Sequence, residues 1–252
     1  MTSSKPYQYV KGYTEFYKLK FKVTPDTLIP RPETELLVDE VLRFVSQLQP
    51  ITYKLQPITI LDLGTGAGNI AISLAKNLSH TRGITIIATD ISKKALKVAK
   101  QNARLHDVQS KITFIQSDLL NVVASPALAG HGNLARKIAS SSPAASPRND
   151  AGIDIIVTNL PYIPTERIPY LDSSVKDFEP HVALDGGEDG FELYRKLFSQ
   201  IKEKSWQPKL IIGEIDYTHG ELAVNESQKY FPYSQIETKK DLARKQRILL
   251  IS

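Results

Sequence analysis

From residue 58 onward, short apolar runs alternate with longer amphipathic stretches. The short runs are rich in β-branched residues and predict buried strands, whereas the longer stretches repeat apolar residues at helical spacing. The predicted strands are 58–63, 84–90, 112–116, 153–158 and 209–214, and the predicted helices are 69–78, 92–105 and 191–203. Ser92 is the expected N-cap of the second helix. Strands that alternate with helices predict an α/β fold, a doubly wound parallel sheet with helices on both faces.

The two ends of the chain follow other patterns. Residues 5–30 hold aromatic and β-branched residues in short runs that Gly12 and Pro25 interrupt, which predicts an N-terminal β-hairpin or short sheet. Prolines and acids then precede an apolar stripe, as they do at a helix N-terminus. Near the C-terminus, 234–238 and 246–251 predict a closing antiparallel pair, so the expected sheet is mixed and seven-stranded.

One stretch, 121–152, breaks the alternation. It is rich in Ser, Ala, Pro and Gly and has little apolar periodicity, which predicts a mobile surface insertion. A substrate-gating loop is the functional alternative. We therefore divide the chain into an N-terminal hairpin at 1–30 and a single domain at 31–252 that carries this insertion.

Composition narrows the chemistry. The 252 residues include no Cys, which excludes disulfides, thiolate zinc sites, iron–sulfur clusters and Cys nucleophiles. The five His are scattered, so no metal site is expected. The net charge of +5 is mild; it permits a nucleic-acid or ribosome-associated partner and equally suits a soluble protein with spare Lys. No apolar run could span a membrane and the N-terminus lacks a secretory core, so we expect a cytoplasmic protein.

A glycine-rich turn joins the first strand of the alternating region to its helix. The turn consists of Gly64, Thr65, Gly66, Ala67 and Gly68. Glycines there allow a tight turn and let a ligand approach the backbone. Asp90 ends the following strand, where a carboxylate accepts hydrogen bonds from ribose hydroxyls. The arrangement indicates an adenosine-containing cofactor, which could be NAD, FAD or S-adenosylmethionine.

The spacing of the glycines favours the last of these. It is Gly-x-Gly-x-Gly rather than the dinucleotide pattern, and Asp62 before it suits the methionyl amino group of S-adenosylmethionine. Asp118 ends the third strand and can accept from the adenine amine, with Leu119 packing on the ring. Acids at successive strand ends place the ligand at the carboxyl edge of the sheet, where open α/β sheets bind ligands.

The fourth strand runs into Asn159, Leu160, Pro161 and Tyr162, hereafter the NLPY segment. The Asn159 side-chain oxygen and the Leu160 carbonyl can accept the two N–H groups of a planar amide or amine. Tyr162 offers an aromatic face. Methyl transfer from a sulfonium depends mainly on alignment, so this segment is the predicted catalytic and substrate-binding element.

These residues resemble those of the PrmC/HemK family of class I, Rossmann-like amino-methyltransferases. The NLPY segment is similar to the Asn/Asp/Ser-Pro-Pro-Tyr/Phe/Trp motif of enzymes that methylate planar nitrogens. The resemblance runs from about residue 6 to the C-terminus, outside the insertion. Besides 64–68 and 159–162, it rests on segments 29–35, 178–184, 185–190 and 240–247.

The resemblance implies methylation of the side-chain amide nitrogen of the glutamine in the Gly-Gly-Gln motif of peptide chain release factors. It further implies that residues 64–68, Asp90, Asp118, Leu119 and Asn159 contact S-adenosylmethionine, that the NLPY segment holds the glutamine, and that the loop carrying Arg31 and Glu35 forms part of the wall over the site. We expect release factors as partners of a monomer, with no stable nucleic-acid partner.

The chain departs from the family in three respects. Leu160 replaces the first proline of the motif, although a residue before Pro161 is already confined to extended backbone. The chain starts at the hairpin, where the family usually has a helical bundle first. The insertion at 121–152 is longer than the family leads one to expect.

Rival interpretations come from other classes. Asn-Leu-Pro-Tyr also resembles the motif of ribosomal RNA adenine dimethyltransferases, and the basic charge agrees with a nucleic-acid methyltransferase. Those enzymes usually carry Glu where Asp90 stands and end in a helical domain, whereas this chain ends in a strand pattern. A binding module without turnover and a dinucleotide oxidoreductase are the remaining alternatives.

Overall fold

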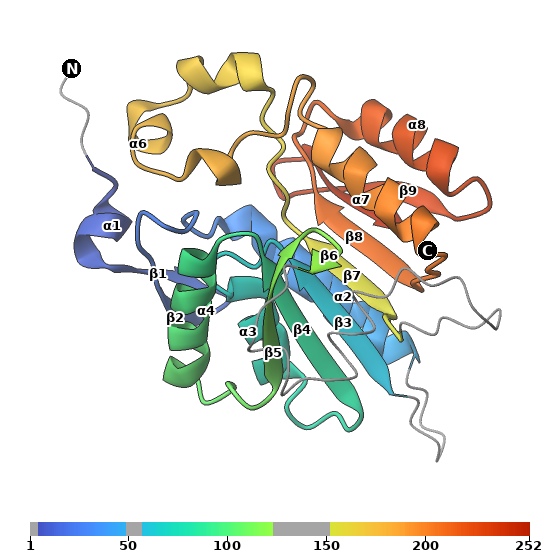
Figure 1. The fold of residues 1–252 in the computed structure, drawn as a ribbon, viewed down its shortest axis with the longest axis horizontal. Coiled ribbons are helices and arrows are strands. Elements are labelled where there is room, and N and C mark those ends of the chain that lie inside the picture. Colours follow the sequence, from blue (N-terminus) through green and yellow to red (C-terminus); the bar gives the residue numbers. More distant parts are fainter. Residues whose placement is uncertain (1–4, 49–56, 123–151) are drawn as a thin grey trace.

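The computed structural model describes residues 5–48, 57–122 and 152–252. Its centre is an eight-stranded sheet in the order β6-β5-β4-β3-β7-β8-β10-β9 (Figure 1). The strands are β3 (Ile58–Leu63), β4 (Ile84–Asp90), β5 (Ile112–Asp118), β6 (Asn121–Val122), β7 (Ile155–Thr158), β8 (Leu210–Glu214), β9 (Ile236–Lys240) and β10 (Gln246–Ile251).

The strand order reverses direction at β3. From β3 the chain adds β4 and then β5 on one side, in parallel, and later adds β7 and β8 in parallel on the other side. β10 is antiparallel to β8, and β9 is antiparallel to β10. Ligands of open α/β sheets bind at such a switch point, outside the carboxyl ends of the strands.

Helices cover both faces of the sheet, as predicted (Figure 1). One apolar core lies between the sheet and the helices α2 (Glu35–Leu48), α3 (Asn69–Asn77) and α4 (Lys93–Leu105). A second core lies under α7 (Glu192–Glu203) and α8 (Gly220–Tyr230), which lie on the opposite face. The strands buried between these layers are almost wholly apolar because both of their faces are covered.

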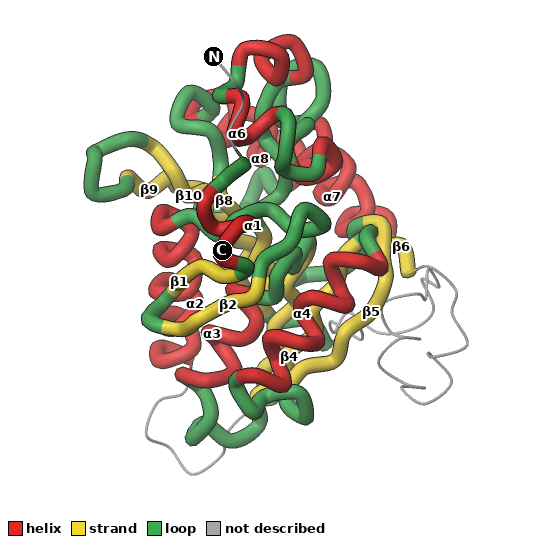
Figure 2. Tube along the Cα trace, turned by 90° about the vertical axis from the view of Figure 1, so that its left-hand side faces the viewer, coloured by secondary structure: helices red, strands yellow, loops and turns green. Residues whose placement is uncertain are grey.

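The N-terminal hairpin is present and packs beside the helices (Figure 2). It consists of β1 (Tyr13–Phe16) and β2 (Leu19–Lys22), and its buried Phe16 and Phe21 join the first core. The backbone N–H of Lys22 donates to Asn102 Oδ1 of α4 at 2.8 Å. The hairpin is thereby fixed to the domain.

The prediction of extended structure for the residues before the hairpin is wrong. Residues 7–11 form a short helix, α1 (Tyr7–Lys11), that ends at Gly12 in a left-handed conformation. Tyr9 turns inward and packs with Val23, Ile29 and Phe178. This packing outweighs the strand propensity of the aromatic residues, which is a weak preference.

The prediction of seven strands is short by one. After β5 the chain doubles back through Leu119, whose φ is +52°, and β6 pairs with the end of β5. Residues 121 and 122 are therefore part of the sheet rather than of the predicted insertion. Residues 123–151, the greater part of that insertion, lie outside the described residues.

Most other elements follow the pattern closely. Three strands have the predicted bounds, namely 58–63, 84–90 and 246–251. Ser92 caps α4, since its Oγ accepts from the Ala95 N–H at 3.1 Å. The helix α8 was not predicted, because its buried positions include Gly220, Ala223 and Ser227, which give no apolar stripe.

A lobe of short helices follows β7. It contains η3 (Thr165–Tyr170), α6 (Ser173–Lys176) and η4 (His181–Ala183), drawn in gold at the top of Figure 1. Far earlier in the sequence, the 3₁₀ turn η1 (Pro32–Thr34) directly precedes α2. Both segments contribute to the cavity described below.

Candidate active site

The glycine-rich turn after β3 is held against the end of β4. Gly64, Gly66 and Gly68 all have left-handed φ angles, between +54° and +85°. The Gly66 N–H donates to Asp90 Oδ2 at 2.8 Å. A Cβ on Gly68 would lie 3.1 Å from the Cβ of Ala99, so α4 could not pack this closely against a larger residue. The turn is thus held in place by Asp90 and α4, and it lines one side of a cavity.

Asp62 lies beneath this turn and does not face the cavity as predicted. Its side chain is fully buried, and Oδ2 accepts from Thr65 Oγ1 at 2.7 Å and from the Ala71 N–H at 3.1 Å. Oδ1 is buried without a hydrogen-bond partner among the described residues. Burial raises the pKa of Asp62 to about 7. Its observed contacts brace the turn and the start of α3.

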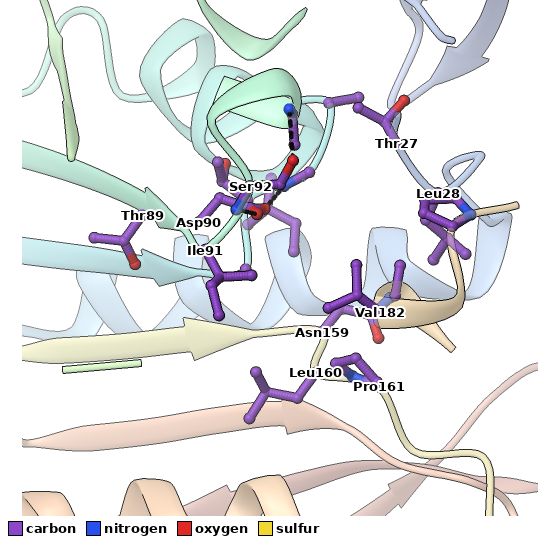
Figure 3. Close-up of a pocket in the computed structure, with 18 of the residues that line it drawn as sticks. Thr27, Leu28, Thr89, Asp90, Ile91, Ser92, Asn159, Leu160, Pro161 and Val182 are labelled. Carbon is purple, nitrogen blue, oxygen red and sulfur yellow. Dashed lines mark hydrogen bonds between the residues drawn. The ribbon is translucent and has the colours of Figure 1, made fainter. Parts of the chain in front are cut away.

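Asp90 ends β4 and lines the cavity, as predicted (Figure 3). Oδ1 accepts from the Ser92 N–H at 2.8 Å, and Oδ2 accepts from Gly66. Burial raises the pKa of the carboxyl, and the N–H donors act against this shift. A carboxylate offers about four lone-pair positions, so these N–H groups leave capacity for a ligand hydroxyl.

The end of β5 supplies the predicted acid and apolar residue. Asp118 and Leu119 both line the cavity. Asp118 is half-exposed and pairs with the Lys196 Nζ of α7 at 2.7 Å. Leu119 is buried, and its left-handed backbone turns the chain toward β6. An amine ligand at Asp118 must therefore share the carboxylate with Lys196.

The NLPY segment leaves β7 on the other side of the same cavity. Asn159, Leu160 and Pro161 line it (Figure 3). The Asn159 Nδ2 donates to Thr34 Oγ1 at 3.1 Å. Leu160 is buried and joins the second core, and its Cδ2 is 3.8 Å from where a Cβ on Gly64 would lie. The apolar Leu160 side chain thus links the predicted substrate segment to the predicted cofactor turn.

Tyr162 is anchored away from the cavity. Among the described residues its side chain is not part of the cavity lining. Its hydroxyl donates to Glu214 Oε1 at 2.9 Å, at the end of β8. Burial and the Glu214 carboxylate raise the pKa of Tyr162 well above its usual range. The predicted aromatic face at the cavity is therefore not formed by Tyr162 in this conformation.

Two neighbouring loops close the cavity on the side across from Asp90. Leu28, Pro30 and Thr34 contribute from the segment before α2, while Val182 and Ala183 contribute from η4. Figure 3 shows Leu28 and Val182 across from Asp90, beyond the strand ends.

A partly buried ion pair joins these two loops. The Arg31 guanidinium pairs with Glu179, whose Oε2 also accepts from the Ile29 N–H at 3.3 Å. Glu35 instead accepts from the Tyr17 N–H at 2.7 Å and so fastens the hairpin to α2. The loop that carries Arg31 contributes Pro30 and Thr34 to the wall of the cavity, as the family resemblance implies.

The segment 184–190 pairs through its backbone with the residue that follows the NLPY segment and so holds that segment in place. The Ile163 N–H donates to the Leu184 carbonyl at 3.1 Å, and the Gly186 N–H donates to the Ile163 carbonyl at 2.9 Å. A Cβ on Gly186 would lie 2.8 Å from both the Pro161 carbonyl oxygen and the Tyr162 Cα. Glycine is needed here for close approach of two backbones.

The cavity therefore unites most of the predicted site. The predicted residues that line it are Gly64, Thr65, Gly66, Ala67, Asp90, Asp118, Leu119, Asn159, Leu160 and Pro161. Gly68 serves packing, and Asp62 and Tyr162 lie outside the lining among the described residues.

Sequence reasoning missed two polar residues that touch the NLPY segment. Glu214 ends a predicted strand, the same signal that identified Asp90. Thr34 lies within segment 29–35, in which only the charged residues Arg31 and Glu35 were predicted to belong to the site. Their contact spans 180 positions of the chain and has no local pattern. Leu28, Ile91 and Val182 were also missed as apolar walls.

In the parts of the chain that the structure describes, no group of three or more His, Asp or Glu is placed to hold a metal ion. The described helices include none that is long and apolar enough to cross a membrane.

Comparison with known proteins gives consistent matches. A family model described as a methyltransferase domain matches residues 56–160. The release factor glutamine methyltransferase of Moorella thermoacetica is 35% identical over 245 residues, which cover 97% of this chain and 74% of that protein. The one from Lactococcus lactis is 34% identical over 248 residues, covering 98% of this chain and 77% of that protein.

Solved structures with low sequence identity share the fold. The human METTL16 catalytic domain, in complex with a hairpin of the MAT2A 3′UTR, has a TM-score of 0.62 at 13% identity, covering 94% of this chain and 75% of that chain. A human methyltransferase 10 domain containing protein has a TM-score of 0.55 at 13% identity, covering 94% of this chain and 89% of that chain. The architecture is the Rossmann-like class I methyltransferase fold.

Proposed function

Because this chain belongs to the family of release factor glutamine methyltransferases, we propose that it methylates a release factor. The methyl group passes from S-adenosyl-L-methionine to the side-chain amide nitrogen of the glutamine in a Gly-Gly-Gln motif. The observation that carries this proposal is the position of Asn159, which shares one cavity with the glycine-rich turn and Asp90.

The residues of the cavity fit S-adenosylmethionine. Asp90 retains free lone pairs for ribose hydroxyls, and the turn at 64–68 exposes backbone to a ligand. Leu119 and Ile91 supply apolar surface for the adenine, and Asp118 supplies an acceptor for its amine. When bound, the cofactor supplies an electrophilic methyl group on a sulfonium centre.

Asn159 and Leu160 would hold the substrate amide. The Asn159 Nδ2 is engaged by Thr34, so the acceptor Oδ1 is the atom left for the substrate. The Leu160 carbonyl would accept the second amide N–H. Pro161 confines Leu160 to extended backbone, which fixes the direction of its carbonyl, and Thr34 holds the Asn159 side chain beside it. Holding the nitrogen in line with the methyl group is the main requirement of the transfer.

The proposal also sets the context of the protein. Its partner is a peptide chain release factor, met transiently as a substrate. We propose that the enzyme acts as a monomer, in the cytoplasm where translation ends, and without a stable nucleic-acid partner.

The test is a methyl-transfer assay with mass-spectrometric mapping. Labelled S-adenosylmethionine is supplied with a release factor, with the same factor carrying Ala in place of the motif glutamine, and with ribosomal RNA. We expect label on the glutamine of the unaltered factor alone. Asn159→Ala should abolish nearly all turnover while the dissociation constant of the cofactor changes little. Label on adenine of the RNA, or none on the glutamine, would refute the proposal.

A further inference from the structure

A buried hydrogen-bond chain runs from the end of β8 to the NLPY segment. Glu214 and Thr34 are both 1% exposed. Thr34 Oγ1 donates to Glu214 Oε2 at 2.6 Å, and Asn159 Nδ2 donates to Thr34 Oγ1 at 3.1 Å. The other carboxylate oxygen, Oε1, accepts from the Tyr162 hydroxyl. One carboxylate thus holds two ends of the NLPY segment.

The direction of every bond in this chain follows from the carboxylate. An ionised carboxylate can only accept, so the Thr34 hydroxyl must give its proton to Glu214. The Thr34 oxygen can then only accept from Asn159. The Asn159 amide must therefore turn its NH₂ group to Thr34, which leaves its Oδ1 for the cavity.

We infer that Glu214 and Thr34 are positioning residues that set which atom of the Asn159 amide faces the substrate. This inference rests on the proposed function, since a substrate amide needs an acceptor at this point. An Asn side chain is otherwise free to present its NH₂ group instead, because its two ends are nearly equal in shape. The reversed amide would direct a donor at the substrate N–H and repel it.

The backbone of Glu214 is fixed as well. Its carbonyl accepts from the Tyr194 hydroxyl of α7 at 2.6 Å. A Cβ on the preceding Gly213 would overlap the Tyr194 ring. Burial raises the pKa of Glu214 above its usual value, although the hydroxyls of Thr34 and Tyr162 and the charge of Arg247 oppose this shift. The side chain of Glu214 thus accepts from two segments, through Thr34 and Tyr162, while α7 fixes its backbone through Tyr194.

The first test replaces the hydroxyl of Thr34. Thr34→Val keeps the shape of the side chain and removes both hydrogen bonds, while Thr34→Ser keeps the hydroxyl and removes a methyl group. We expect kcat for methyl transfer to fall on the order of 10–100-fold in Thr34→Val. The dissociation constant of S-adenosylmethionine should stay unchanged, and Thr34→Ser should restore most of kcat. Equal kcat in the wild type and Thr34→Val would overturn the inference.

The second test converts one acceptor oxygen of Glu214 into a donor NH₂ group without changing the size of the side chain. In Glu214→Gln, the new NH₂ group must face either Thr34 or Tyr162, so one of these hydroxyls loses its acceptor. If the NH₂ group faces Thr34, the Thr34 oxygen must accept from it, and we expect a kcat loss of similar size, with the melting temperature measured in parallel. The side-chain NH₂ signals of Asn159, described below, show whether its bond to Thr34 is lost. Wild-type kcat in a folded Glu214→Gln variant that has lost this bond would also overturn the inference.

A readout independent of turnover separates this inference from the proposed function. The side-chain NH₂ signals of ¹⁵N-labelled Asn159, assigned with an Asn159→Asp variant, report its hydrogen bond to Thr34. They should shift and exchange faster with water in Thr34→Val and recover in Thr34→Ser. If they do so while the wild type methylates no release factor, the positioning role stands and the proposed function fails. Signals that do not move would overturn the positioning role.

Discussion

Two buried carboxylates near the site, Asp90 and Asp62, are held in different ways. Each oxygen of Asp90 accepts one backbone N–H and the carboxylate opens onto the cavity. Asp62 has one oxygen with two donors and another with none among the described residues. A carboxylate that lines a cavity and keeps free lone pairs can bind a ligand. A carboxylate that is fully buried, such as Asp62, can instead stabilise the backbone around it through its hydrogen bonds.

For Asp90 we predict a direct effect on cofactor affinity. Asp90→Ala removes a charged acceptor for ribose hydroxyls, an interaction of about 1.5–3 kcal/mol, so the dissociation constant of S-adenosylmethionine should rise about 10-fold or more. Isothermal titration calorimetry measures it. Asp177→Ala, which removes a charge from an exposed position in the lobe, is the control and should bind as the wild type does. Unaltered affinity in Asp90→Ala would remove Asp90 from the cofactor site.

For Asp62 we predict a pH dependence of stability. Its pKa is raised from 3.8 to about 7, so between these values the folded state binds more protons than the unfolded state. The contribution of this group to stability is therefore greatest at low pH and is lost as the pH rises through 7. Compared with Asp62→Asn, the wild type should lose about 2–3 kcal/mol of unfolding free energy between pH 5 and pH 8.

Urea unfolding of both proteins at the two pH values measures the difference. Asp177→Asn serves as the exposed control, for which the same comparison should show no change. A difference between wild type and Asp62→Asn that is constant with pH would mean that Asp62 is ionised throughout this range.

At the scale of elements, each loop of the site is held by contacts with another loop: the NLPY segment by 184–190, and the loop of Arg31 by the loop of Glu179. The NLPY segment is bordered by β7 on one side and by the segment 184–190 on the other. The strands, the capped start of α4 and the cofactor turn could be predicted, because each has a local pattern of apolar spacing, capping or glycine. The short helix at 7–11 and α8 could not, since packing of Tyr9 in one case and a face of small residues in the other decide their structure.

The close approach of Gly186 to the NLPY segment leads to a prediction. In Gly186→Ala the new Cβ would lie 2.8 Å from three backbone atoms that cannot rotate away, two of them in the NLPY segment, so this segment and 184–190 must move apart. We expect a stability loss of about 1–3 kcal/mol, as for other overpacked sites, and a fall in kcat. Thermal unfolding and the methyl-transfer assay measure the two effects.

Gly12→Ala is the matched control. Gly12 has a φ of +78° but no atom within 4 Å of an added Cβ. This variant should lose stability through backbone strain and keep kcat. If Gly186→Ala kept kcat as well, the segment 184–190 would have no part in positioning the site.

At the scale of the whole molecule, the cavity joins segments that are far apart in the sequence. Its walls come from 26–34, 64–70, 89–95, 117–119, 159–161 and 180–183, together with Leu193. The meeting of 64–70, 89–95, 117–119 and 159–161 at one sheet edge follows from alternating strands and helices and could be predicted. The contacts of Thr34 with Glu214 and of Arg31 with Glu179 could not, because they depend on the tertiary path of two loops.

Ligand binding across so many segments should stabilise the entire domain. At a cofactor concentration 100 times the dissociation constant, linkage gives about 2.7 kcal/mol. For a chain of 252 residues, this corresponds to a rise of about 5–10 °C in the melting temperature. Differential scanning fluorimetry measures the rise, which Asp90→Ala should reduce and Asp177→Ala should not. No shift with saturating S-adenosylmethionine would contradict the cofactor assignment.

The bond between Thr34 and Glu214 has a consequence for synthesis of the protein. The strands β3, β4, β5 and β7 are complete once residue 158 has been made, so a nascent chain can form this part of the sheet first. Until β8 has left the ribosome and paired with β7, Thr34 lacks the Glu214 carboxylate that takes its proton and so makes its oxygen the acceptor for the Asn159 amide. A partly synthesised chain can thus form the cofactor turn before it is able to methylate a release factor. The substrate site is therefore completed only after β8, in the final third of the polypeptide, has been made.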